Sequence, residues 1–197
     1  MYYGLYKNLR DGAWNTLLDN NISSLPVDVA AIAHASDIKL IKDSDVNILL
    51  NGEHGRVYCA NNEWFIVYNE KNPTDKSRYT IAHELGHIFL GHNLALLKYS
   101  KAPKTNKKPK SEQQADMFAE RLLCPACVLW ALNLKTPEEI ARVCGVPLDV
   151  AKRRAKRMEE LYKRNKFITS PLEESVFKLF NDFIRNMNGD VVDKTFD

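Results

Sequence analysis

The 197-residue chain is 45% hydrophobic and 27% charged, with a formal net charge of +3. These values exclude a wholly disordered, collagen-like or coiled-coil chain, and the charge is too small to indicate a class of partner. The longest strongly apolar stretch, residues 122–132, is far shorter than the roughly 18 to 20 residues of a membrane span. The first residues also lack the basic cap and apolar run of a secretory signal. We therefore expect a cytoplasmic protein with no membrane partner, whose four cysteines are reduced.

Two helices are predicted at the start of the chain. Apolar residues recur at helical spacing over residues 3–19, and residues 20–26 interrupt the pattern. Pro26 fits the first turn of a second, short helix over residues 27–35, because a proline there gives up no helical hydrogen bond.

A small antiparallel sheet is expected next. Strand-like segments occupy residues 38–41, 56–60 and 64–68, and Asn61 and Asn62 are typical of the turn in a hairpin that joins the last two. A peptide substrate can pair with the edge of such a sheet as an added strand, and we expect residues 64–68 to form that edge.

The helix predicted after the hairpin, over about residues 72–91, contains the sequence H-E-L-G-H at residues 83–87. His83 and His87 stand one helical turn apart on one face, where both imidazoles reach a single Zn²⁺. Glu84 lies about 100° around the helix, where it reaches a metal-bound water without ligating the metal. The alternative is an exposed helix with two solvated histidines. The helix start and the hairpin before the motif favour the metal site.

A catalytic zinc needs three protein ligands and one position open to water, so the third ligand should come from another helix. That helix is predicted to begin at Ser111, with Gln114 completing a capping box. Glu112 heads it, and Asp116 lies one turn later, where it accepts the free N–H of a ligating histidine. Glu120 competes for the third-ligand role. Glu112 also has the simpler interpretation of an acid favoured by the helix dipole.

These motifs resemble the ImmA/IrrE family of metallo-endopeptidases. The resemblance rests on R-Y-T-I-A-H-E-L-G-H at residues 78–87, E-Q-Q-A-D-M-F-A at residues 112–119 and L-L-C-P at residues 122–125. It extends more weakly from the first helix to about residue 161. Where the family carries a second glutamate this chain has Gln114, which removes a rival ligand, and Cys124 replaces a methionine conservatively.

The resemblance implies one Zn²⁺ per chain, bound by His83, His87 and Glu112 in a gluzincin-like ligand set. It further implies that Glu84 is the general base and that Asp116 orients a ligand. The implied fold class is α+β: a small antiparallel sheet packed on helices that carry the zinc site, followed by a helical C-terminal extension.

The implied activity is that of a zinc-dependent endopeptidase. By the same resemblance, its substrate is a helix-turn-helix (Xre-type) repressor, whose cleavage relieves repression in a mobile-element or stress circuit. The alternative is a non-proteolytic regulator that binds DNA or a repressor and holds a structural zinc. Glu84 argues against this alternative, since a structural site needs four ligands and no base.

A lysine-rich loop is predicted between the two metal-binding helices, because residues 99–110 contain two prolines and no large aliphatic residue. It is either a solvated spacer or a positive field that steers an acidic or DNA-bound substrate. A second donor to the oxyanion is expected beside the metal. The candidates are His92, five residues after His87, and Tyr99 at the mouth of the loop.

The remaining chain is predicted to be helical. The helices are expected over residues 126–133, 137–144, 148–164 and 172–187. The second and third of these resemble a helix-turn-helix, with basic residues 152–157 on the recognition helix. Related segments in the ImmA/IrrE family look like helices packed on the protease. We therefore favour a packing or docking role, with direct DNA binding as the alternative.

The last predicted helix carries an apolar stripe that must be covered, either by this chain or by a second copy or the repressor. We divide the chain into a metallopeptidase domain at residues 1–130, a helix-turn-helix-like extension at 131–166, and a C-terminal amphipathic helix and tail at 167–197.

Overall fold

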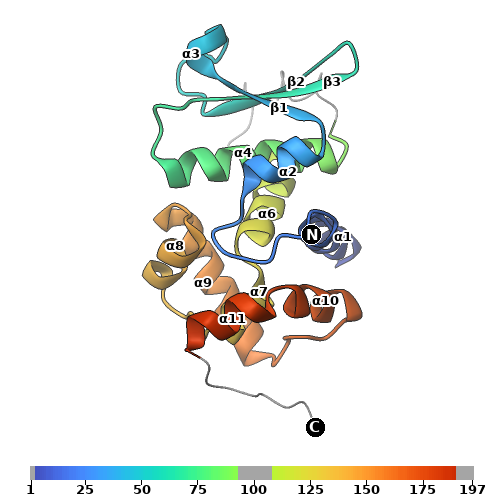
Figure 1. The fold of residues 1–197 in the computed structure, drawn as a ribbon, viewed down its shortest axis with the longest axis vertical. Helices are drawn as coiled ribbons and strands as arrows, with labels where there is room; N and C mark the ends of the chain where they lie inside the picture. The colour runs from blue at the N-terminus through green and yellow to red at the C-terminus, as the bar shows by residue number, and fades with distance from the viewer. Residues whose placement is uncertain (1–2, 93–107, 190–197) are drawn as a thin grey trace.

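A three-stranded sheet covers one end of a helical body (Figure 1). The structure is a computed structural model, and it describes residues 3–92 and 108–189. In chain order its elements are α1 (Tyr3–Asp19), α2 (Val29–Ala35), β1 (Ile38–Lys42), α3 (Asp43–Val46), β2 (Gly55–Ala60), β3 (Glu63–Tyr68), α4 (Thr74–Phe89), α6 (Lys110–Leu123), α7 (Ala126–Ala131), α8 (Pro137–Cys144), α9 (Leu148–Lys163), α10 (Pro171–Leu179) and α11 (Asn181–Asn188). The expected α+β class is confirmed.

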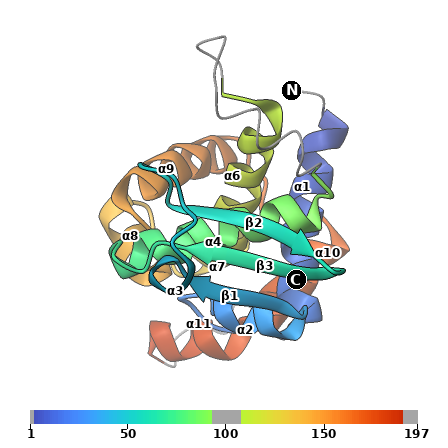
Figure 2. The same cartoon turned by 90° about the horizontal axis from the view of Figure 1, so that it is seen from above.

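The sheet has the strand order β1-β3-β2 (Figure 2). The predicted hairpin of β2 and β3 is confirmed, and Asn61 and Asn62 both adopt positive φ, as its two-residue turn requires. The expectation of a wholly antiparallel sheet is wrong at β1, which pairs parallel to β3. The reason is the connection at residues 43–54, which carries the chain past β3 and places β2 on its far side.

The same topology corrects the predicted substrate edge. Residues 64–68 belong to β3, which is the central strand, because β1 occupies the side opposite β2. The edges of the sheet are therefore β1 and β2, and β2 is the edge that packs against α4.

Helices α4 and α6 cross at close range. A Cβ atom added to Gly86 would lie 3.1 Å from Phe118 Cδ1 and 3.2 Å from Ala115 Cα. Both Ala115 and Phe118 are fully buried. The glycine of the H-E-L-G-H motif therefore lets the backbones of the two helices approach each other.

The capping box predicted at the start of α6 is wrong. The helix begins at Lys110 with Pro109 in the N-cap position, and no side chain caps it. Ser111 is consequently inside the first turn and cannot act as the cap. The side chain of Gln114 is then free to bond elsewhere, as described below. The helix over residues 27–35 also begins later than predicted, since Asp28 rather than Pro26 provides its start and caps it.

Helices α8 and α9 form the predicted helix-turn-helix, a helical hairpin with Gly145 in the left-handed conformation between the two helices. Ile140 and Ala151 are fully buried and belong to one core cluster that extends from α1 to α11. Within the basic segment 152–157, Arg154 is buried, while Arg153 and Arg157 form ion pairs with residues of this chain. Three of the cations in this segment are therefore buried in the fold or paired with carboxylates of this chain.

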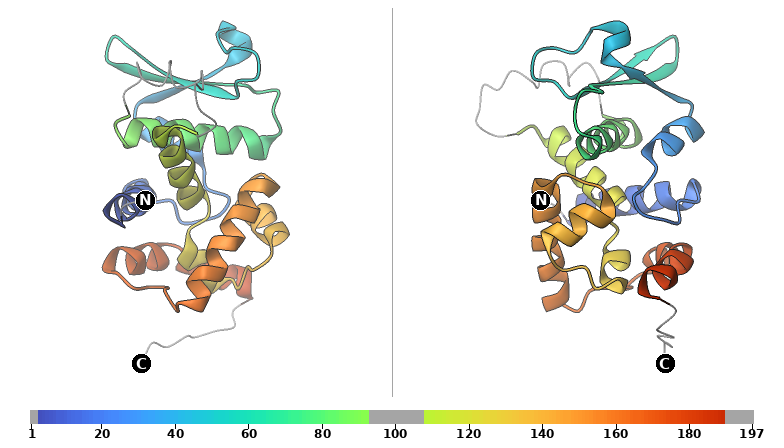
Figure 3. Two further views of the ribbon diagram at one scale, coloured as in Figure 1. Left: turned by 180° about the vertical axis from the view of Figure 1, so that it is seen from behind. Right: turned by 60° about the vertical axis from the view of Figure 1, so that its left-hand side comes forward.

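The single helix predicted over residues 172–187 is wrong, because the helix breaks at Phe180 into α10 and α11. Helix α10 lies along α1 (Figure 3). The side chain of Asn188, at the end of α11, donates a hydrogen bond to the Ala131 carbonyl. The break lets Val176 and Phe180 both be fully buried. The apolar stripe is therefore covered by this chain, apart from Met187, which is 48% exposed.

The structure also bears on the expectations about membrane spans and disulfides. In the described ranges, no helix is both long enough and apolar enough to span a membrane. The four cysteines are unbridged, with Cys59 exposed and the other three buried.

Gly86→Ala tests the crossing of α4 and α6. Alanine is favoured in a helix, but here the added methyl meets backbone atoms of α6. We expect the free energy of unfolding to fall by about 1–2 kcal/mol in urea denaturation of the metal-free protein. Gly12→Ala in α1 is the matched control, since its Cβ would meet nothing closer than 3.9 Å, and it should raise that free energy by about 0.5–1 kcal/mol. Equal stabilisation by both changes would contradict the close contact.

Candidate metal centre

Helices α4 and α6 bring three ligand atoms together. The Nε2 atoms of His83 and His87 are 3.0 Å apart. Glu112 Oε2 lies 3.3 Å from His83 Nε2, and Glu112 Oε1 lies 3.5 Å from His87 Nε2. His87 is almost fully buried, and the other two side chains are partly buried. The third group predicted from the sequence thus lies at the histidine pair.

These separations fit a small divalent cation. Ligand atoms placed 2.0–2.1 Å from a tetrahedral zinc lie about 3.3–3.4 Å from one another. The three observed distances bracket that value. The lone pairs of two imidazole nitrogens and a carboxylate oxygen also point toward one another here. A cation between these three atoms would stabilise this arrangement. Among the described residues, His83, His87 and Glu112 form a group whose ligand atoms lie within 4.8 Å of one another, close enough to hold one metal ion.

Glu120, the competitor for the third-ligand position, lies elsewhere. Its carboxylate accepts a hydrogen bond of 2.6 Å from Arg153 Nε and belongs to the contact between α6 and α9. At Glu112, burial would raise the carboxyl pKa, but the hydrogen bond and charge of His83 outweigh burial and lower it. The carboxylate form that a metal requires is therefore favoured.

Asp116 lies behind His83. Its Oδ1 is 2.9 Å from His83 Nδ1 and also accepts a hydrogen bond of 3.1 Å from the Tyr79 hydroxyl, while Lys108 pairs with the other oxygen. Burial alone would raise the pKa of Asp116, but the contacts with His83 and Lys108 lower it to about 2. Burial would likewise lower the pKa of His83, but Asp116 and Glu112 raise it to about 9. The surroundings thus favour positive charge at this imidazole.

His92, one of the two candidates for an oxyanion donor, lies behind His87, on the side of its Nδ1 atom and away from the ligand atom Nε2. Its Nδ1 is 2.9 Å from His87 Nδ1, and its Nε2 is 3.2 Å from Gln114 Oε1. If His87 offers the lone pair of Nε2 to a metal, its proton is on Nδ1 and is donated to His92. His92 then carries its own proton on Nε2 and donates it to Gln114. Burial lowers the pKa of His92, which favours this neutral form.

The ligand atoms open into a cleft of 600 Å³ between the start of β2, helices α4 and α6, and the start of α9. Glu84 is 8% exposed and lines this cleft beside His83. A Cβ atom on Gly55, the first residue of β2, would lie 2.4 Å from Thr80 Cγ2 and 3.5 Å from Glu84 Cγ. The edge strand therefore begins directly against Glu84. The other proposed donor, Tyr99, lies outside the described residues, as does most of the lysine-rich loop.

Comparison with known proteins identifies the family. The model of the Peptidase M78 family, described as the IrrE N-terminal-like domain, matches residues 37–156, which is more than half of the chain. The chain belongs to this family. The M78 match spans the sheet, α4 and α6, and therefore every residue of the candidate metal centre.

No curated protein gives a significant match to the sequence. A solved structure described as a Mycobacterium tuberculosis transcriptional regulator shares the fold, with a TM-score of 0.53 and 15% identity. The match covers 75% of this chain and 46% of that chain, so this chain spans less than half of that protein's length. At such low identity the likeness concerns the fold alone.

Three side chains around the candidate metal centre were not predicted from the sequence: Tyr79, Lys108 and Gln114. Tyr79 precedes His83 by one helical turn on the same face, and that spacing was available to find it. Gln114 was assigned to a cap, although it faces His92. Lys108 precedes α6, and its proximity to Asp116 depends on the path of the chain there.

Metal analysis tests the ligand set. We expect the purified protein to retain about one zinc per chain after dialysis, and His83→Ala, His87→Ala and Glu112→Ala each to lose it, because two ligands hold zinc far more weakly than three. Glu120→Ala is the control on the same helix and should retain the metal. Retention by Glu112→Ala together with loss by Glu120→Ala would move the third-ligand assignment to Glu120.

The chain of hydrogen bonds from His87 to Gln114 predicts a role for His92 in metal affinity. His92→Ala removes the acceptor that fixes the His87 tautomer, so zinc affinity, measured by competition with a chelating dye, should fall by about 10–100-fold. His34→Ala, at an exposed histidine, is the control and should leave the affinity unchanged. An unaltered affinity in His92→Ala would show that this contact does not orient the ligand.

Proposed function

We propose that this M78 domain is a zinc-dependent endopeptidase in which His83, His87 and Glu112 hold the metal and Glu84 is the general base. The observation that carries the proposal is the convergence of these three ligand atoms beside a carboxylate that lines an accessible cleft. Within the described residues the cluster supplies three ligands, as a catalytic zinc site requires, where a structural site uses four.

When bound, zinc supplies a Lewis acid for the scissile carbonyl and lowers the pKa of water to about 7. Glu84 would take a proton from the attacking water and return it to the leaving amine nitrogen. Glu84 lines the cleft from α4, and Glu112 lines the same cleft from α6. Asp116 and His92 would hold the two imidazoles in the orientation that directs both Nε2 atoms to the metal.

The substrate is proposed to bind as an extended segment along β2. This strand is paired only with β3 among the described strands, and its first residue lies against Glu84. The outer edge of β2 thus offers backbone amides and carbonyls to a peptide beside the general base. Such binding requires a segment that is extended or locally unfolded, which selects loops and linkers of a folded substrate.

We further propose a helix-turn-helix repressor as the substrate, with cleavage relieving repression in the cytoplasm. Two observations support this: the motif resemblance to the ImmA/IrrE family, and a similar fold in a protein described as a transcriptional regulator. The competing function is that of a regulator that binds the repressor without cleaving it. Only the peptidase needs Glu84 as a general base, so a substitution at Glu84 distinguishes the two functions.

Glu84→Gln tests the chemistry directly. The amide cannot accept a proton from water, so cleavage of a helix-turn-helix repressor that the wild-type protein cleaves should fall by about 10²–10⁴-fold, measured as fragments by mass spectrometry at equal zinc content. Glu138→Gln, at an exposed acid of α8, is the control and should cleave normally. Wild-type cleavage by Glu84→Gln would remove Glu84 from the mechanism. Repressor binding without fragments from the wild-type protein would favour the binding function.

A further inference from the structure

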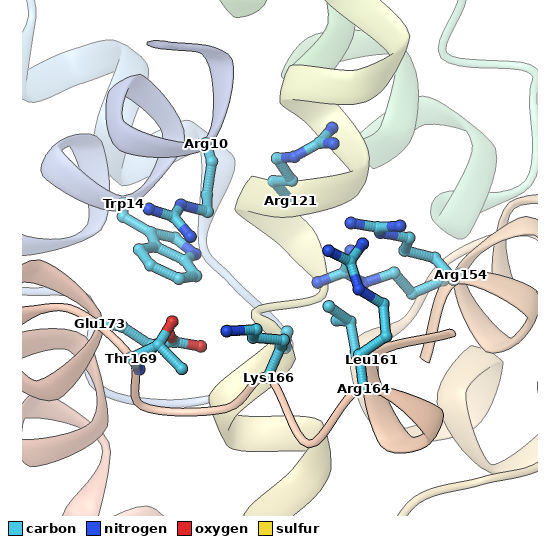
Figure 4. A pocket seen from close by; sticks show the side chains of 11 residues that line it. Arg10, Trp14, Arg121, Arg154, Leu161, Arg164, Lys166, Thr169 and Glu173 are labelled. Atoms are coloured by element: carbon cyan, nitrogen blue, oxygen red, sulfur yellow. Dashed lines mark hydrogen bonds between the residues drawn. The ribbon is translucent and has the colours of Figure 1, made fainter. Parts of the chain in front are cut away.

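A second cavity, of 350 Å³, lies in the helical body between α1, the C-terminal end of α6, α9 and the segment that leads into α10 (Figure 4). It is separate from the metal centre, which uses the N-terminal end of α6. Its lining contains six cationic side chains: Arg10, Arg121, Arg154, Arg157, Arg164 and Lys166. Figure 4 shows side chains from these four parts of the fold arranged around one common space.

The carboxylates near this cavity in the described part of the chain are few. Glu173 is the acidic residue of the lining, and Asp11 and Glu160 pair from outside with Arg10 and Arg157. Among the residues that the structure describes, these three carboxylates are fewer than the cationic side chains of the lining. Arginine stays protonated in proteins, so the five guanidinium groups cannot relieve their repulsion by losing protons.

Arg154 is the most unusual member of the group. It is 4% exposed, and no acceptor in the described residues reaches its Nε. Trp14, which is 2% exposed, likewise has no acceptor at Nε1. Burying a guanidinium without an anionic partner is unfavourable. Two unsatisfied donors therefore lie in the wall of one positive cavity, where the oxygens of an anion could accept from both.

We propose that this cavity binds a small phosphorylated molecule of about mononucleotide size. A phosphate group offers several oxygens to guanidinium groups that approach from different helices, which suits Arg121, Arg154 and Arg164. The volume lies within the range of about 300–1,000 Å³ that is typical of small-molecule sites. Trp14, with the Arg10 guanidinium 4.7 Å from its ring centre, provides a flat wall for a ring system.

A small ligand fits better than the backbone of a nucleic acid. Arg154 and Trp14 are almost wholly buried, so a duplex lying on the surface does not reach their donors. The exposed cations of α9, Lys152 and Lys156, are the ones that such a surface contact would use. The inference concerns binding alone and does not depend on the proposed peptidase activity.

Isothermal titration calorimetry of the full chain tests the site, with 5′-AMP, inorganic pyrophosphate and inorganic phosphate as probes. We expect 5′-AMP or pyrophosphate to bind with a dissociation constant below about 1 mM. Arg154→Met keeps most of the side-chain volume but removes the charge, and should weaken binding by about tenfold or more. Lys156→Met on the same helix is the matched control and should leave binding unchanged. Tighter binding of 5′-AMP than of pyrophosphate would assign a nucleotide, and the reverse order a phosphate chain without a base.

Trp14→Phe provides a second variant if Arg154→Met does not fold, because it removes only the Nε1 donor and part of the ring. It should weaken the same probe, and the probe should raise the melting temperature of the wild-type protein. Failure of all three probes to bind at about 1 mM would overturn the proposal. So would equal weakening by Lys156→Met, or binding of a duplex oligonucleotide that Arg154→Met abolishes and 5′-AMP does not displace.

Discussion

The close crossing of α4 and α6 at Gly86 is the constraint on which the rest of the site depends. Two ligands come from one helix and the third from another, so the distance between the helix axes decides whether one ion can touch all three. Without a side chain at Gly86, Ala115 of α6 approaches the backbone of α4. That approach places the Glu112 carboxylate within 3.5 Å of both imidazoles. The glycine of the motif is thus needed for the packing of the two helices, just as the histidines are needed as ligands.

Polar contacts behind the ligands connect the centre to the rest of the fold. Asp116 fixes His83 and is itself bonded to Tyr79, whose hydroxyl is 3.4 Å from Arg153 of α9. Arg153 also holds Glu120 of α6. The hairpin of α8 and α9, which resembles a DNA-binding motif in sequence, is in this way part of the support for the metal centre. On its other side, the same helix α9 contributes Arg154 to the cationic cavity.

Much of this arrangement could be predicted from the sequence, because helical periodicity and the spacing of His83, Glu84 and His87 are local properties. The position of Glu112 needed the family resemblance, since nothing local fixes how α6 crosses α4. The parallel pairing of β1 depends on where a long connection travels, and the break at Phe180 depends on which surface each half of the helix covers. Gln114 was misassigned because it stands three residues after Ser111, as in a capping box, whereas its contact with His92 depends on how α6 packs against α4. The sequence alone predicts a solvated cation at Arg154, because its burial depends on residues that become its neighbours only in the fold.

The central claim is that three side chains from two helices hold a zinc ion with one position left open. A crystal structure of the zinc-loaded protein, with anomalous scattering recorded at the zinc edge, tests it most directly. We predict one anomalous peak bonded to Nε2 of His83 and of His87 at about 2.0–2.1 Å and to a carboxylate oxygen of Glu112, with no fourth protein ligand. A peak with a fourth protein ligand, or one centred away from His83 and His87, would contradict it.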